Sequence, residues 1–382
     1  MKKILLATLL VLSLEAQEIA EYMAECNHNQ KDKLCVALNK NFDQAISAYR
    51  KHQLKEAIDG FEKLIEVAQK NKIEPAHFYN NLGLAYHYNR QHNKALELFN
   101  KNLAYEKKKK QPKRQSLISV YNNMGLAYQA KKEMSKAVEV VKKALELALK
   151  EGKKSQIAEE YNRVGIMLRA NREYDQAIEH YQKSIEMKQK EIPKDYAMIL
   201  AVYSDIVGSY QDKREYSKAL KVLDKSFEIQ KKVLAKNHPK FIEHYMFKGY
   251  LNFQNKNYNK AIKAYSKAQE LALKRVGEKD INMTQIYIWL AKSWQEQRAF
   301  DKAIALYEKT LAIYLNKLGK KHPTVATTYN SLGALHVVKG EHDKGLALYE
   351  KALPIARENF DEKHQIVQMI LSNIKRVKEI MK

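Results

Sequence analysis

One eight-residue pattern recurs along the chain and constrains its fold more than any other feature. It reads Tyr-Asn-Asn-Leu-Gly-Leu-Ala-Tyr at residues 79–86 and returns at 121–128 with one change. The leading tyrosine stands at positions 79, 121, 161, 203, 245, 287 and 329. A small residue follows sixteen positions after each tyrosine: Ala95, Ala137, Ala177, Ala219, Ala261, Ala303 and Gly345. Such a period predicts a row of similar units instead of two or three unrelated globular domains.

Each unit has the pattern of two helices. Tyr79, Leu82 and Tyr86 are spaced as one buried helical face. The polar stretch 89–93 predicts a turn, and a second apolar helical face begins at Ala95. Neither helix pair could bury its apolar face alone, so the repeats are expected to stack on one another.

The repeated residues, together with two His-Pro loops at 237–239 and 321–323, resemble the tetratricopeptide repeat (TPR) family. The 42-residue period is similar to the kinesin-light-chain subclass of that family. A degenerate first repeat is traced at Ala45, Leu54, Ala57 and Phe61. The resemblance covers about residues 38–360. It implies an all-α, right-handed α-solenoid of about eight helix-turn-helix repeats with terminal capping helices, the last at 361–382.

The first sixteen residues have the composition of a secretory signal peptide. Lys2 and Lys3 precede an apolar run of eleven residues, Ile4 to Leu14, which is too short to span a bilayer. Cleavage after Ala16 is expected, giving an exported protein that is periplasmic or secreted and has no membrane span in its mature chain. An uncleaved N-terminal anchor is the alternative.

Residues 17–37 are expected to form a helical cap that contains the two cysteines, Cys26 and Cys35. In one straight helix their nine-residue separation would place them about 13.5 Å apart, too far for a disulfide. A turn at residues 27–30 would let the thiols meet, and an oxidising compartment favours the bond. We therefore expect a Cys26–Cys35 disulfide. A reactive thiol or a metal site with His28 is the weaker alternative.

The chain carries a formal net charge of +24, most of it from lysine. The most basic stretch is residues 107–114, in the loop that follows the second repeat. Such a charge steers acidic partners or anionic surfaces towards a protein. It is also what a lysine-rich composition places on solvated helix faces. Export argues against a nucleic-acid partner.

The sequence contains none of the common catalytic motifs. There is no Gly-x-x-x-x-Gly-Lys-Ser/Thr loop, no His-Glu-x-x-His and no Gly-x-Ser-x-Gly. The tyrosines are placed by the repeat and are expected to pack in the core. We therefore expect no enzyme activity, no catalytic residue, no metal site and no cofactor.

By the resemblance, function resides in the concave groove lined by the first helix of each repeat. The groove residues implied for repeats 2 to 4 are Asn80, Asn81, His87, Asn122, Asn123, Gln129, Asn162, Arg163 and Arg169. Asparagine both donates and accepts hydrogen bonds, so a ladder of them suits the backbone of an extended peptide. Arg163 and Arg169 are expected to bind acidic groups. The alternative is that the asparagines are only the repeat's consensus.

Further along, aromatic residues replace the amides at the same repeat positions. Phe247, Phe253 and Trp289 are expected to be apolar anchors, since aromatic side chains often dominate binding energy. They could instead pack against the C-terminal helix or a second copy of the chain. The sequence thus predicts an exported, non-catalytic scaffold that binds a protein or peptide of acidic character. Recruitment of an anionic envelope polymer or lipid is the main alternative, and a binding subunit of a sensor or enzyme complex is a weaker one.

Overall fold

The computed structural model describes residues 33–71, 75–190 and 194–382, and these ranges fold entirely into helices and their connections. No β-strand occurs within them. Helices α2 to α17 alternate as the first (A) and second (B) helix of successive hairpins, and α18 follows alone. The predicted all-α solenoid of TPR-like repeats is therefore confirmed.

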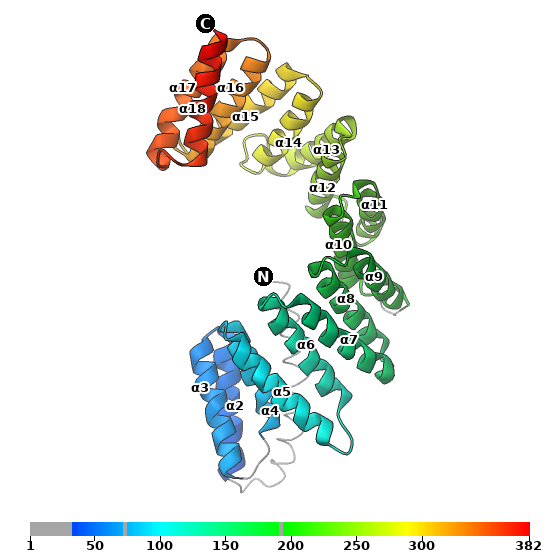
Figure 1. Ribbon diagram of the computed structural model, residues 1–382. Coiled ribbons are helices and arrows are strands. Elements are labelled where there is room, and N and C mark those ends of the chain that lie inside the picture. The colour runs from blue at the N-terminus through cyan, green and yellow to red at the C-terminus, as the bar shows by residue number, and fades with distance from the viewer. Residues whose placement is uncertain (1–32, 72–74, 191–193) are drawn as a thin grey trace. The chain divides into compact units, whose positions relative to one another are not determined.

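The chain divides into two compact units, the first ending at Ser209 and the second beginning at Tyr210. Figure 1 labels their helices. Unit 1 contains α2 (Lys33–Arg50), α3 (Leu54–Lys70), α4 (Ala76–Tyr88), α5 (His92–Lys108), α6 (Arg114–Ala130), α7 (Met134–Glu151), α8 (Lys154–Ala170), α9 (Tyr174–Gln189) and most of α10 (Tyr196–Asp212). Unit 2 contains α11 (Tyr216–Val233), α12 (Lys240–Gln254), α13 (Tyr258–Val276), α14 (Met283–Glu296), α15 (Phe300–Lys317), α16 (Pro323–Val338), α17 (His342–Asn359) and α18 (Gln365–Ile380).

Small residues at fixed positions let the two helices of a hairpin cross closely. A Cβ added to Gly165 on α8 would lie 2.6 Å from the Tyr181 ring on α9. The same addition at Gly333 would lie 2.7 Å from the Tyr349 ring. In these hairpins the ring of the B helix thus occupies the space that a side chain on the A helix would need. This contact explains why the glycine and the aromatic residue keep their spacing from repeat to repeat.

The turn from A helix to B helix uses a left-handed residue, and in seven repeats that residue is not glycine. His52, Arg90, Lys132, Arg172, Arg214, Lys256 and Arg298 have φ between 56° and 65°. After Arg90, the N–H of Gln91 reaches back to the Tyr86 carbonyl at 2.8 Å, which closes the end of the helix. A positive side chain at a helix C-terminus also complements the helix dipole. That attraction offsets part of the strain of the left-handed backbone.

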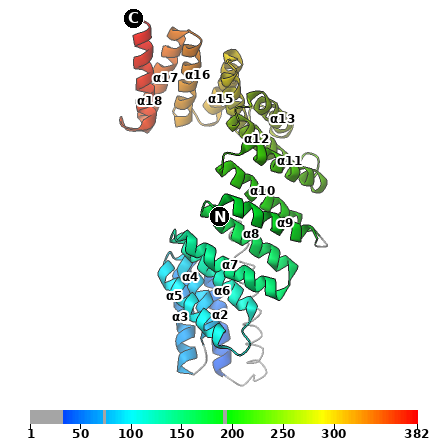
Figure 2. The ribbon, with the colours of Figure 1, turned by 45° about the vertical axis from the view of Figure 1, so that its right-hand side comes forward.

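Each unit has its own buried core, formed by the facing sides of its hairpins. In unit 1 the core runs from Leu38 to Ile157, and in unit 2 three clusters lie along α12 to α18. Helix α18 packs against α16 and α17, and the three lie side by side in both ribbon views (Figure 2). No helix in the described ranges is long and apolar enough to cross a membrane.

Histidines of the predicted His-Pro loops accept hydrogen bonds at helix starts. His322 caps α16 and its Nδ1 accepts from the backbone N–H of Thr324, while Pro323 stands at the first helical position. His238 Nδ1 accepts from Lys240 N–H at 3.2 Å in the same way. These two histidines thus have a structural role at the starts of α12 and α16. The predicted signal peptide and Cys26 lie outside the described residues, so cleavage and the disulfide stay predictions.

Candidate functional site

Four of the five asparagines in the predicted ladder of unit 1 are covered by protein, and two of them bond each other. Asn80, Asn81, Asn122 and Asn123 are all buried, with 3–4% of each residue exposed. Asn123 Nδ2 on α6 donates to Asn80 Oδ1 on α4 at 2.9 Å. This bond joins the A helices of neighbouring repeats.

The same link occurs in unit 2, between residues that are also 43 positions apart. Asn373 Nδ2 on α18 donates to Asn330 Oδ1 on α16 at 2.9 Å. In unit 1 the Oδ1 of Asn81 is buried without a hydrogen-bond partner. Phe42 holds the position of the first repeat that corresponds to Asn80, so Asn81 has no amide of a preceding repeat to bond. The amide row therefore stabilises the stack, and its buried groups are not displayed as a peptide ladder.

A buried carboxylate continues this polar row between α6 and α8. Asn122 Nδ2 donates to Glu160 Oε1 at 2.9 Å, and Arg163 Nε lies 3.5 Å from Glu160 Oε2. Glu160 is only 3% exposed, and its burial raises the pKa of its carboxyl above the ordinary value despite the opposing effects of Arg163 and Asn122. Arg163, predicted to bind an external acidic group, thus already faces an internal one.

Replacing Glu160 by glutamine tests this buried charge. A raised folded-state pKa means that the carboxyl favours folding when protonated, and that this stability is lost as pH rises from about 4.5 through the folded-state pKa. We therefore expect Glu160→Gln to gain stability over wild type progressively above pH 4.5, measured by urea denaturation between pH 4 and pH 8.

The matched control is Glu139→Gln. Glu139 is exposed and hydrogen bonded by Lys143, which lowers the pKa of its carboxyl. Its substitution should show the opposite trend, losing stability relative to wild type as pH rises. A Glu160→Gln difference that stays constant with pH would contradict the buried-charge account.

The remaining predicted residues of unit 1 are partly exposed but do not form one cluster. His87 lies 5.0 Å, ring to ring, from His92, and burial together with that neighbour lowers the pKa of His87 to about 4. Arg169 Nη1 is 3.9 Å from Asp205 Oδ1, and its guanidinium covers Gly208. Gln129 and Asn162 are also partly exposed, although the Oδ1 of Asn162 is buried without a hydrogen-bond partner. Both predicted arginines therefore already lie near a carboxylate of the protein itself, Arg163 near Glu160 and Arg169 near Asp205.

In unit 2, by contrast, the predicted aromatic anchors come together. The Trp289 ring on α14 lies 5.5 Å from Phe253 and 5.7 Å from Tyr250, both edge-to-face from α12. Phe247 stacks on Tyr250 at 6.1 Å. We call Phe247, Tyr250, Phe253 and Trp289 the aromatic cluster; every member is partly exposed.

The aromatic cluster rests on a buried ring and has a cation at its edge. Trp289 stacks on Tyr265 of α13, which is fully buried, at 6.0 Å between ring centroids. The ammonium of Lys292 lies 4.9 Å from the indole centroid. These contacts all come from α12 to α14. Trp289 on α14 therefore packs against the preceding repeat, which consists of α12 and α13. The result is a preorganised apolar surface with a cation beside it.

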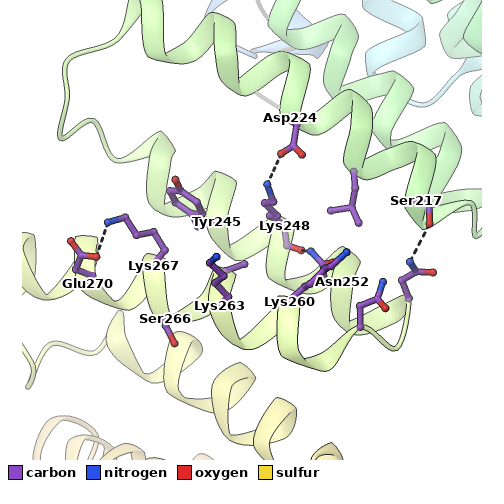
Figure 3. Close-up of a pocket in the computed structure, with 14 residues that line it drawn as sticks. Ser217, Asp224, Tyr245, Lys248, Asn252, Lys260, Lys263, Ser266, Lys267 and Glu270 are labelled. Atoms are coloured by element: carbon purple, nitrogen blue, oxygen red, sulfur yellow. Dashed lines mark hydrogen bonds and ion pairs between the residues drawn. The ribbon is translucent and has the colours of Figure 1, made fainter.

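Unit 2 also contains an open groove of about 830 Å³ (Figure 3). Helix α12 contributes Tyr245, Lys248 and Asn252, and α11 contributes Ser217, Leu220 and Asp224. The remaining lining residues are Asn255, Asn257, Lys260, Lys263, Ala264, Ser266, Lys267 and Glu270, from the connecting turn and α13. We call this the basic groove.

Many surface lysines elsewhere are paired with glutamates one helical turn away. Glu97–Lys101, Glu139–Lys143 and Glu179–Lys183 form ion pairs of 2.6–2.7 Å at equivalent places in three B helices. In the predicted basic run, Lys109 is 2.5 Å from Glu106, and Arg114 is 3.4 Å from Glu151. The positive charge is therefore partly neutralised along the hairpins. No group of histidine, cysteine and acidic residues that could hold a metal occurs among the described residues.

Sequence reasoning missed Tyr250, Glu160 and the lysines of the basic groove. Tyr250 stands midway between Phe247 and Phe253, so its helical spacing alone could have placed it in the aromatic stripe. The lysines at 260, 263 and 267 also share one face of a helix. Lysine is so frequent in this chain that these three did not stand out as a pattern.

Comparison with known proteins agrees with this architecture. Models described as tetratricopeptide repeat match residues 76–108, 116–190, 199–240, 242–275 and 282–358. No curated protein sequence matches the chain.

Solved structures with a similar fold include the C-terminal part of a TPR repeat-containing protein from Cytophaga hutchinsonii. It is 19% identical, with a TM-score of 0.52, over 76% of this chain and 98% of that one. The apo form of the quorum sensor NprR from B. thuringiensis is 15% identical, with a TM-score of 0.51, over 90% of this chain and 95% of that one. Putative kinesin light chain TPR-like repeats from Podosopora anserina are 18% identical, with a TM-score of 0.39, over 64% of this chain and 97% of that one.

The repeated hairpins, their close glycine–aromatic crossings and the stacked cores define a helical repeat protein of the solenoid class. The matches to the repeat models extend over most of its length. The chain belongs to the tetratricopeptide repeat family.

Proposed function

We propose that this protein is a scaffold that binds a protein or peptide partner through the A-helix face of unit 2, anchored on the aromatic cluster. The supporting observation is the geometry around Trp289. Its indole is partly exposed, rests on the buried Tyr265 ring and has the Lys292 ammonium beside it. An aromatic surface that is already fixed by its neighbours loses little conformational entropy when a partner binds. Tryptophan and tyrosine are also the residues most often found at binding hot spots.

The proposal places the peptide site in unit 2, away from the asparagine row of unit 1. Asn80, Asn81, Asn122 and Asn123 of unit 1 are buried, and the Asn123–Asn80 bond joins two repeats. A partner would have to open the stack to reach them. The partner is expected to offer an apolar side chain to Trp289, with an acidic group near Lys292. On this proposal the protein acts by binding and carries out no reaction.

A peptide selection on the intact chain tests the proposal. Peptides selected from a displayed random library should bind wild type, and Trp289→Ala should weaken the binding about 30-fold, the size of a hot-spot loss near 2 kcal/mol. Isothermal titration calorimetry measures the dissociation constants.

Trp294→Ala is the matched control for this test. Trp294 is a second partly exposed indole on α14, and it has its own lysine, Lys302, 4.1 Å from its centroid. Its removal should leave the peptide affinity within about threefold of wild type, since it is not part of the aromatic cluster. Equal losses in both variants, or no loss in Trp289→Ala, would reject the aromatic cluster as the binding site.

Export is part of the same proposal and is supported by the composition of residues 1–16. Expression with those residues in a two-membrane bacterium should release a chain that begins at Gln17 into the periplasm. Intact-mass spectrometry of the fractionated protein reads the N-terminus directly. A full-length chain retained in the membrane fraction would favour the uncleaved anchor.

A further inference from the structure

The basic groove and the aromatic cluster lie on opposite faces of one helix. Along α12 the groove takes Tyr245, Lys248 and Asn252, whereas the cluster takes Phe247, Tyr250 and Phe253. With 3.6 residues per turn, each residue advances about 100° around the helix, so the two sets face roughly opposite directions. The groove is therefore a separate surface, and a ligand bound there would not depend on the proposed function of the aromatic cluster.

The groove has more positive than negative charge. Four lysines line it, at 248, 260, 263 and 267, with two carboxylates, Asp224 and Glu270. Lys248 Nζ is 2.7 Å from Asp224 Oδ1, and Lys267 Nζ is 2.6 Å from Glu270 Oε2. Within the described residues Lys260 and Lys263 have no such partner, and both are exposed. The ammonium groups of Lys260 and Lys263 are thus not neutralised by a carboxylate of the groove.

These two ammonium groups point to one part of the groove. Lys260 and Lys263 are three residues apart on α13, about one helical turn, and Figure 3 labels both of them with Lys248 in the lining of the groove. Like charges one helical turn apart repel each other, and an anion between them relieves that repulsion. The exposed amide of Asn257 and the exposed hydroxyl of Ser266 also line the groove and can hydrogen bond a polar chain.

We propose that the basic groove binds an acidic peptide segment, with carboxylate side chains held by Lys260 and Lys263. The two carboxylates in the lining favour a peptide over a uniform polyanion. A nucleic acid or an anionic membrane would bring unbroken negative charge against Asp224 and Glu270. A peptide can place an acidic side chain at the two lysines and a neutral or basic one beside the carboxylates. The volume of about 830 Å³ lies within the range of ligand-binding clefts.

The test measures binding of a fluorescein-labelled twelve-residue peptide in which glutamates alternate with serine and glycine. Its counterpart has glutamine in place of every glutamate. The intact chain should bind the acidic peptide and not the glutamine peptide in fluorescence anisotropy. Lys260→Glu combined with Lys263→Glu should weaken the acidic peptide at least about tenfold, because two attractive charge pairs become repulsive.

The control pair is Lys218→Glu with Lys221→Glu. These exposed lysines hold the same two repeat positions on α11, one repeat earlier, and neither lines the groove. Because the net charge change is the same, a general effect of the protein's field would weaken both pairs equally. We expect the control pair to stay within about threefold of wild type. Trp289→Ala should bind the acidic peptide as wild type does. The proposal for the basic groove and the proposal for the aromatic cluster can therefore be rejected independently of each other.

Three results would overturn the proposal. One is unchanged affinity for the acidic peptide in the groove variant, with circular dichroism showing it folded. Another is an equal loss in the groove and control pairs. The third is tighter binding of a single-stranded oligonucleotide or phosphatidylglycerol vesicles than of the acidic peptide, since that would assign the lysines to a polyanion.

Discussion

Replacing Tyr265 by alanine should lower the free energy of unfolding by about 3–5 kcal/mol, the range for removing a buried aromatic side chain. Tyr265 is fully buried, and its ring fills the space against Gly249 on the partner helix of its hairpin. Because the ring also supports Trp289, the aromatic cluster should loosen with it. Urea denaturation followed by circular dichroism measures the stability, and Trp289 fluorescence, read in a Trp294→Phe background, reports on the cluster.

Tyr265→Phe is the control that separates packing from hydrogen bonding. The Tyr265 hydroxyl is buried without a hydrogen-bond partner, and burial raises the pKa of the phenol above its ordinary value. Removing an unsatisfied hydroxyl while keeping the ring should leave the stability within about 1 kcal/mol of wild type. If the phenylalanine variant were as unstable as the alanine variant, the hydroxyl would have an essential partner and the packing account would be wrong.

The repeat architecture could be predicted because its causes are local and repeated. Gly165 and Tyr181 are sixteen residues apart in one hairpin, and the same two residue types recur at Gly333 and Tyr349. A glycine faces a large side chain of the second helix at this spacing in five hairpins, and the repetition makes a periodic signal that survives the variation of surface positions. The left-handed turn residues could not be predicted in this way. Most of them are arginine or lysine, and only the backbone shows their φ.

The candidate site was harder to predict because burial depends on neighbouring repeats. Asn80 and Asn123 have the hydrogen-bonding capacity of peptide-binding residues, but they lie where two A helices meet and bond each other. The sequence alone does not show whether an amide on that face meets solvent or the next repeat. Phe253 contacts Trp289, and Phe247 stacks on Tyr250, because aromatic residues at helical spacing in neighbouring repeats share one face. Whether a partner binds them stays a prediction.

His244 should make unit 2 sensitive to acid. Its ring stacks on Phe227 at 3.7 Å between centroids, and both ring nitrogens are buried without hydrogen-bond partners. Burial, with smaller effects from the nearby charges of Lys248 and Lys231 opposed by Asp224, lowers the pKa of His244 to about 4 from 6.5. A lowered pKa means that folding favours the neutral ring. The stability from this residue is therefore complete above pH 6.5 and is lost as pH falls towards 4, by up to about 3 kcal/mol.

Phenylalanine at position 244 keeps the stack on Phe227 and removes the proton site, so His244→Phe should resist acid better than wild type. The two proteins should differ least at pH 8, where the imidazole is neutral in both the folded and unfolded chain, and most near pH 4. Urea denaturation at each pH gives the difference in unfolding free energy. His336→Phe serves as the contrast, because the His336 ring nitrogen is 2.6 Å from Glu341 Oε2 and its loss should bring no gain in acid. If the His244→Phe difference did not grow as pH fell, the imidazole would have to find a proton acceptor or solvent in the folded protein, and the α11–α12 contact around Phe227 would be looser than its stacking distance implies.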